Sequence, residues 1–225
     1  MQDAPFFEDF TVGDDFSDVP AITLTEGYAA IHQAMFADRS RLFLDVELCD
    51  RVTGQHRLLA NPSLVANMAI GQSTIPSQRV MGNLFYRGLH FHRPVFIGDT
   101  LKTTTKVVAL RQNKIREGRA ASGMVALEMH VTNQIGQTVL LFWRCPMIPC
   151  RDAAADTGQN DSFDLMPEGI KDEKLISHIP ECNFGFFRDP VPGRHFSDYD
   201  SGERLEVESR DTITQAPELV RMTLN

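Results

Sequence analysis

The sequence predicts an α+β fold in which an antiparallel sheet wraps around one central helix. Three observations support this prediction. A segment that is apolar on almost every side begins near Asn61, and long segments with strand-like alternation follow from about residue 84 to residue 143. In addition, residues 196–225 align without gaps on residues 7–36, which predicts the opening of a second, similar domain.

The first helix is expected to begin in the segment Thr23-Leu24-Thr25-Glu26. Thr25 is a suitable N-cap because its hydroxyl can accept a hydrogen bond from a free backbone amide of the first turn, and the negative charge of Glu26 favours the positive end of the helix dipole. The apolar residues that follow at helical spacing are Tyr28, Ile31, Met35 and Phe36. A polar, arginine-bearing segment, residues 38–45, comes after this helix.

The second helix is expected to begin at Asn61-Pro62-Ser63. Asn61 can cap the helix, and proline is well tolerated at the first helical position because the amide that it lacks would have no partner there. The apolar residues Leu64, Val65, Met68, Ala69 and Ile70 surround this helix on nearly all sides. It should therefore be buried inside the sheet.

Four strands are expected after the second helix. Residues 84–92 alternate, with Phe85, Leu89 and Phe91 on one face, and Gly98-Asp99 provides the next turn. The segment 101–110 is rich in Thr and Val, and residues 125–132 alternate between apolar and polar side chains. The turn Asn133–Gly136 then joins this strand to residues 138–143 in a long hairpin.

The internal repeat predicts the domain organisation. A shift of 189 positions places Phe196, Asp198, Tyr199 and Gly202 on Phe7, Asp9, Phe10 and Gly13. We therefore expect one complete domain at residues 6–150, a polar linker at residues 151–195 with a short helix near Glu168–Ile179, and the opening segment of a second domain at residues 196–225. On this interpretation, most of the second copy lies beyond Asn225.

Composition narrows the class of protein. The net charge of −8 argues against nucleic acid as a partner, because phosphate binding needs a concentrated basic surface. The longest apolar stretch, residues 139–148, is too short to span a bilayer. No secretory signal is visible, and the four cysteines form no C-x-x-C pair, so reduced thiols and a cytoplasmic location are expected.

Two segments carry a resemblance to a known family. The segment Phe91–Leu101, FHRPVFIGDTL, and the opening Phe7–Gly13, FEDFTVG, resemble the hotdog fold of MaoC-like acyl-CoA hydratases. Ala37-Asp38-Arg39 and Gly82-Asn83-Leu84 are similar to the mesaconyl-CoA hydratase (methylmalyl-CoA dehydratase) branch, which is built from two fused hotdogs. The resemblance implies a hydro-lyase that adds water to an enoyl-CoA. It implies no metal or redox cofactor, coenzyme A as part of the substrate, and a homodimer or pairing with a second hotdog.

The resemblance also implies a site. Asp38 lies where the family has its catalytic aspartate, and Arg39, Asn61 and Ser63 are the expected substrate-binding residues. Two positions depart from the family pattern. Phe43 stands where the catalytic histidine would be, and Pro62 has no amide to offer at the start of the second helix.

These departures leave three functions open. The first is the hydratase, which residues 1–225 by themselves should support only slowly. The second is a hotdog thioesterase, and the third is a non-catalytic acyl-CoA-binding half of a double-hotdog protein. No metal site is expected, because His90 and His92 have no third ligand at suitable spacing, and His32 is expected to be a lone residue.

Overall fold

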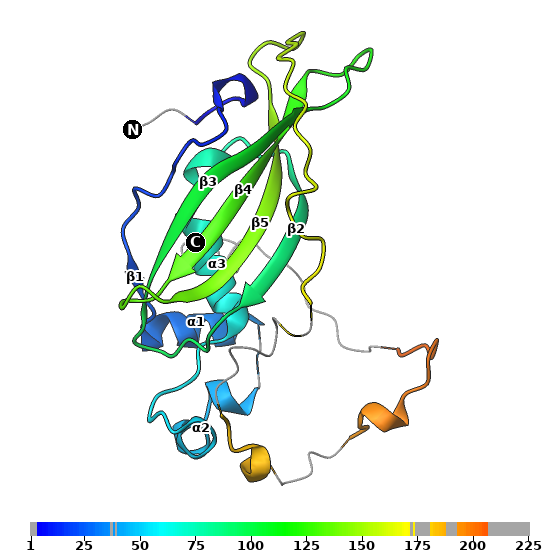
Figure 1. Ribbon diagram of the computed structural model, residues 1–225. Coiled ribbons are helices and arrows are strands. Elements are labelled where there is room, and N and C mark those ends of the chain that lie inside the picture. The colour runs from blue at the N-terminus through cyan, green and yellow to red at the C-terminus, as the bar shows by residue number, and fades with distance from the viewer. Residues whose placement is uncertain are drawn as a thin grey trace.

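The computed structural model describes residues 4–36, 38, 40–171, 173, 181–187 and 193–206. A five-stranded antiparallel sheet in the order β1-β3-β4-β5-β2 curves around helix α3, which confirms the expected fold class (Figure 1). The strands are β1 Ile22–Thr23, β2 Gly82–Phe91, β3 Thr100–Gln112, β4 Ser122–Thr132 and β5 Thr138–Pro149. The helices are α1 Glu26–Phe36, α2 Val46–Thr53 and α3 Pro62–Gln72.

Helix α3 begins as the sequence predicts. The Asn61 side chain accepts a hydrogen bond from the Ser63 amide at 2.7 Å, and Pro62 occupies the first turn. The helix buries one face only, with Leu64, Val65 and Met68 turned to the sheet. The expectation that this helix is buried holds for one side only, because Ala66, Asn67 and Ile70 are half-buried. The sheet formed by the described residues covers one side of the helix.

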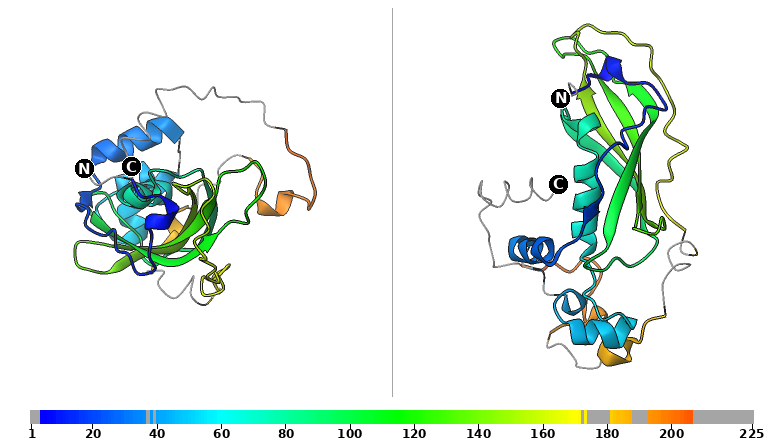
Figure 2. Two further views of the ribbon diagram at one scale, coloured as in Figure 1. Left: turned by 90° about the horizontal axis from the view of Figure 1, so that it is seen from above. Right: turned by 90° about the vertical axis from the view of Figure 1, so that its left-hand side faces the viewer.

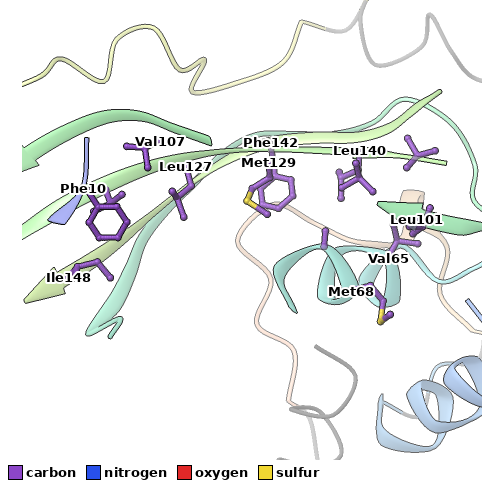
Figure 3. Close-up of a cluster of buried hydrophobic side chains, with 14 of the residues drawn as sticks. Phe10, Val65, Met68, Leu101, Val107, Leu127, Met129, Leu140, Phe142 and Ile148 are labelled. Carbon is purple, nitrogen blue, oxygen red and sulfur yellow. The ribbon is translucent and has the colours of Figure 1, made fainter. Parts of the chain in front are cut away.

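The main core lies between α3 and the concave face of the sheet (Figure 3). Val65 of α3 lies under Leu140 and Leu101, and Met129 and Phe142 cover the middle of the sheet. The other end of the core holds four further side chains: Phe10, Val107, Leu127 and Ile148. Burial of these large apolar groups is the main favourable contribution to folding.

Strand β2 does not alternate as the sequence predicts. Its pairing with β5 shifts register between Asn83 and Tyr86 and again between Arg87 and His90. Phe85 therefore packs on the convex side of the sheet against Phe163, at 5.8 Å between ring centroids, whereas Phe91 packs against the main core. The prediction that these two rings share a face was wrong, because a bulge reverses the alternation of every residue beyond it.

The segment after β5 packs on the convex side of the sheet. Figure 2 shows residues 151–171, in yellow, on the side of the sheet opposite α3. Phe163 and Met166 form an outer cluster with residues of the sheet, among them Ala126 and Trp143. The sequence predicted a linker from residue 151, and at least its first part adds a layer to the domain. The boundaries at residues 150 and 195 stay predictions, and most of the expected helix near Glu168–Ile179 lies outside the described residues.

Helix α2 lies in a segment, residues 46–53, for which no element was expected. Asp45 caps it by accepting a hydrogen bond from the Leu48 amide at 2.9 Å, and Gly54 ends it with a φ of 70°. Its buried face, Leu48, Cys49 and Val52, lies beside the later segment 181–187, where the Asn183 amide donates to the Val52 carbonyl at 2.8 Å. The spacing of these apolar residues is helical, so the sequence does carry the signal for α2.

The opening turn of the chain recurs near its C-terminal end. In η1, Phe7–Asp9, the Asp9 carboxylate accepts from the Phe6 amide at 2.9 Å; in η5, Phe196–Asp198, the Asp198 carboxylate accepts from the His195 amide at 2.7 Å. A positive φ follows in both copies, 98° at Gly13 and 85° at Gly202. The environments differ, since Phe7 is 1% exposed and Phe196 is 97% exposed. The repeat therefore extends to local geometry, and residues 207–225 lie outside the described part.

Phe7 and Gly123 of β4 form a tight contact that a mutation can test. A Cβ atom at position 123 would lie 2.2 Å from the ring of Phe7, which is far inside van der Waals contact. Gly123→Ala should lower the free energy of unfolding by about 1–3 kcal/mol, the usual cost of overpacking a core. Urea denaturation of Gly123→Ala, Phe7→Leu and the double variant measures it. The double variant should lose less stability than the sum of the losses in the two single variants. A loss equal to that sum would contradict the contact.

Candidate active site at the start of the central helix

Four polar side chains meet at the N-terminal end of α3. They come from three segments: His32 from α1, Asp38 from the loop that follows, and Asn61 and Ser63 from the start of α3. Nε2 of His32 lies 2.7 Å from Oγ of Ser63, and the Asn61 amide group donates a hydrogen bond to the Asp38 carboxylate. Asn61 thus links the predicted catalytic residue to the helix that it caps.

Asp38 is held as an anion. Partial burial tends to raise the pKa of its carboxyl group, but hydrogen bonds from the Ser40 amide at 3.0 Å and from Asn61 outweigh burial, so that the pKa lies below its ordinary value. A carboxylate that accepts several hydrogen bonds is stabilised in its charged form. Asp38 is therefore ionised at neutral pH and can accept a proton.

His32 lies behind this carboxylate in a buried position. Its side chain is 1% exposed and its ring packs on Phe36 at 4.6 Å between centroids. Burial lowers the pKa of His32, and the negative charge of Asp38 opposes that shift only in part. The imidazole is therefore neutral at neutral pH. Its Nδ1 atom is buried and has no hydrogen-bond partner among the described residues.

The expectation that His32 is a lone residue was wrong. Its partner Ser63 lies 31 positions further along the chain, so no local pattern could reveal the pair. One signal was available: His32 stands among Tyr28, Met35 and Phe36 at helical spacing, which puts a polar ring on the apolar face of α1. A buried histidine needs a hydrogen-bond partner, and that need predicts a polar contact across the interface.

Two further positions of the family pattern are Phe43 and Arg39. Phe43, which stands in place of the family's histidine, lies in η2, Arg41–Phe43, and its carbonyl accepts a hydrogen bond from the Gln33 side chain at 2.7 Å. The loop therefore accepts a hydrogen bond from α1 at this position, and the phenylalanine side chain provides no imidazole. Arg39, the predicted substrate-binding arginine, lies outside the described residues.

The first turn of α3 has few free amides. Pro62 has none, and the Ser63 amide is bonded to the Asn61 side chain. In the described part of the chain, the Leu64 amide has no hydrogen-bond acceptor, so it is the remaining backbone donor of this turn. The start of a helix carries partial positive charge and favours an anion. The arrangement suits an oxygen that gains negative charge during a reaction.

The described residues outside this group form no metal site. Within the ranges that the structure describes, no group of three His, Cys, Asp or Glu side chains is placed to hold a metal ion. The rings of His90 and His92 lie 4.3 Å apart between centroids, tilted by 44°, and line a cavity of about 290 Å³ with Trp143, Pro167 and residues 169–171. This cavity lies beside the segment that packs on the convex side of the sheet.

A pH titration of stability tests the neutral state of His32. Unfolding exposes the imidazole, whose ordinary pKa is about 6.5, so below that pH the unfolded chain binds a proton that the folded chain does not. The stability contributed by neutral His32 is present above the ordinary pKa and is lost as the pH falls. Between about pH 7.5 and 5.5 the wild type should lose about 1 kcal/mol more than His32→Gln in urea denaturation. Equal losses would mean that folding leaves the pKa of His32 unchanged.

Comparison with known proteins finds two similar enzymes. The chain is 30% identical over 218 residues to β-methylmalyl-CoA dehydratase of Chloroflexus aurantiacus, and 30% identical over 231 residues to mesaconyl-CoA hydratase of Cereibacter sphaeroides. These matches cover 94% and 97% of the chain, which spans 59% and 63% of the two relatives. No protein-family model matches the chain.

Two solved structures are similar to this chain over nearly its whole length. Rv0216 of Mycobacterium tuberculosis, a protein with a double hotdog fold, superposes with a TM-score of 0.79 at 41% identity, covering 99% of this chain and 67% of that one. A MaoC domain protein dehydratase of Chloroflexus aurantiacus superposes with a TM-score of 0.80 at 28% identity, covering 98% and 62%. The fold is thus that of a hotdog protein.

The chain belongs to the MaoC-like hydratase and dehydratase family. In the described part of the chain, no helix combines the length and the apolar character that crossing a membrane would require.

Proposed function

We propose that this protein is a hydro-lyase that reversibly adds water to an enoyl-CoA, with mesaconyl-CoA or another short or branched acyl group as substrate. The observation that carries the proposal is the hydrogen bond from Asn61 to the Asp38 carboxylate at the start of the central helix of a MaoC-like hotdog. β-Methylmalyl-CoA dehydratase and mesaconyl-CoA hydratase, to which the chain is similar, are named for the dehydration and the hydration of such thioesters.

The proposed reaction needs a base, an acid and a donor to the thioester oxygen. The Asp38 carboxylate takes a proton from the water that attacks Cβ, and electron density moves onto the thioester oxygen as an enolate. The start of α3 stabilises that oxygen, because its partial positive charge and free donor are fixed before the reaction begins. Asp38 then returns the proton to Cα, which restores the thioester and the free carboxylate. No metal or redox cofactor takes part.

A direct assay separates the candidate reactions. Hydration of mesaconyl-CoA and crotonyl-CoA is followed by the loss of enoyl absorbance, and release of free coenzyme A is followed with a thiol reagent. We expect hydration without thiol release, at a slow rate, because Phe43 provides no second proton-transfer group. Thiol release without hydration would show a thioesterase instead.

A non-catalytic acyl-CoA-binding half is the second candidate. Phe43 and Pro62 favour it, since each removes a group that the family uses for catalysis. Calorimetric titration with butyryl-CoA, which has no double bond to hydrate, measures binding by itself. Binding of butyryl-CoA with no turnover of either enoyl-CoA would support this candidate and overturn the hydratase.

We also infer that the open side of the domain pairs with a second hotdog. Strand β2 ends the sheet, and apolar side chains are exposed along and beside it: Met81, Leu84, Tyr86 and Leu89. An uncovered sheet edge with apolar neighbours favours association. Sedimentation velocity should show a dimer, and a compact monomer at all concentrations would contradict it.

A cytoplasmic location fits the four cysteines, all of which are free.

A further inference from the structure

The hydrogen bond between His32 and Ser63 determines which of the two groups donates. A neutral imidazole carries its proton on one nitrogen only. If Nδ1 carried it, a buried N–H group would have no acceptor, since Nδ1 has no partner among the described residues. Unpaired buried N–H groups are rarer than unpaired acceptors, because each loses a strong hydrogen bond to water. The proton therefore belongs on Nε2, which donates to Oγ of Ser63 at 2.7 Å.

This assignment frees the hydroxyl proton of Ser63. Oγ accepts from His32, so its own O–H is free to donate elsewhere. Ser63 is exposed at the start of α3, whereas His32 is buried behind it. The hydroxyl is therefore the accessible member of the pair. It stands beside Pro62, at the turn where the first backbone donor is missing.

We propose that the Ser63 hydroxyl is a catalytic hydrogen-bond donor to the thioester oxygen of the substrate, and that His32 is a positioning residue that holds this hydroxyl as a donor. The proposal rests on the proposed hydration reaction. The hydroxyl and the Leu64 amide, neighbours in the first turn, together make a pair of donors in place of the amide that Pro62 lacks. His32 itself transfers no proton in this arrangement.

Three variants separate this role from the alternatives. Ser63→Ala removes the donor and should lower kcat for crotonyl-CoA hydration by about 10²–10³-fold, the usual cost of losing one donor to a developing oxyanion. His32→Gln should keep most of the activity, because the side-chain amide of glutamine can place an N–H where Nε2 stands. His32→Leu offers no donor to Oγ and should lose activity nearly as far as Ser63→Ala, with KM little changed.

A spectroscopic measurement observes the hydrogen bond without depending on turnover. Crotonyl-CoA labelled with ¹³C at the thioester carbonyl is bound to the 225-residue chain, and its C=O stretch is recorded by difference infrared spectroscopy. The band should move to lower frequency on binding to the wild type and to His32→Gln. It should stay near its solution value in Ser63→Ala. Circular dichroism of each variant identifies any variant that fails to fold. If one fails, His32→Gln is the variant that is compared with the wild type.

The results of these experiments separate the role of Ser63 from the hydratase activity itself. Wild-type hydration with an unchanged carbonyl band and unchanged kcat in Ser63→Ala would overturn the role of Ser63 and leave the hydratase intact. Loss of activity in His32→Gln equal to that in His32→Leu would make His32 an acid or base. Mass spectrometry that finds an acyl group on Ser63 would reverse the assigned donor and indicate a nucleophile. Absence of both binding and hydration in the wild type would overturn both proposals.

Discussion

Replacing Arg144 by methionine should lower the free energy of unfolding by about 1.5–3 kcal/mol, the usual contribution of hydrogen bonds to a charged group. Arg144 of β5 is 2% exposed, and its guanidinium donates to the carbonyl and hydroxyl of Ser73 and to the hydroxyl of Ser77, at 2.7–2.9 Å. All three acceptors are buried. Methionine would fill much of the volume and leave the acceptors without a donor.

The position of Arg144 explains why a buried cation is tolerated. Ser73 is the C-cap of α3, where unpaired carbonyls concentrate partial negative charge. Burial lowers the pKa of the guanidinium, and contact with Tyr86 opposes that shift. The arginine thus closes the end of α3 opposite to the candidate site and fixes the helix to the sheet.

Urea denaturation of three variants measures this effect. Arg144→Lys should lose less stability than Arg144→Met, because an ammonium keeps the charge and part of the hydrogen bonding. Arg116→Met is the matched control: this arginine is exposed in the β3–β4 loop, and its loss should change stability by no more than about 0.5 kcal/mol. Equal effects at positions 144 and 116 would show that the buried network contributes nothing.

Asp38→Asn should reduce kcat/KM for hydration of mesaconyl-CoA by about 10²–10⁴-fold, because the amide cannot accept the proton of the attacking water. The change keeps the size of the side chain and can keep the contact with Asn61, so folding should be little affected. The loss should fall on kcat more than on KM, since the base acts in the chemical step.

The control for Asp38→Asn removes the same charge elsewhere. Asp50 lies on α2 with its side chain 43% exposed and close to His56, so Asp50→Asn should leave turnover unchanged. The acid limb of the pH profile gives a second test. The pKa of Asp38 is lowered, so activity should persist as the pH falls to the ordinary range of aspartate and decline only below it. Undiminished turnover in Asp38→Asn would remove Asp38 from the mechanism.

Local sequence determined the elements whose signals act over a few residues. Thr25 caps α1, with its hydroxyl 3.3 Å from the Tyr28 amide, and Asn61 with Pro62 starts α3. The alternation in residues 125–132 follows the burial of β4. Strand β5 runs past the expected residue 143 to Pro149, because pairing with β2 and β4 maintains it through Arg144 and Pro146. Caps and period-two alternation are local properties, so one sequence is enough to predict them.

Only the tertiary structure decided which residues meet in the candidate site. The sequence placed Asp38, Asn61 and Ser63 there through the family resemblance, and these three do lie together. It missed His32, whose contact with Ser63 depends on how α1 packs against the start of α3. The register shifts of β2 likewise depend on pairing with β5. Contacts between distant segments are set by packing and hydrogen-bond geometry in three dimensions, and no periodicity within a segment encodes them.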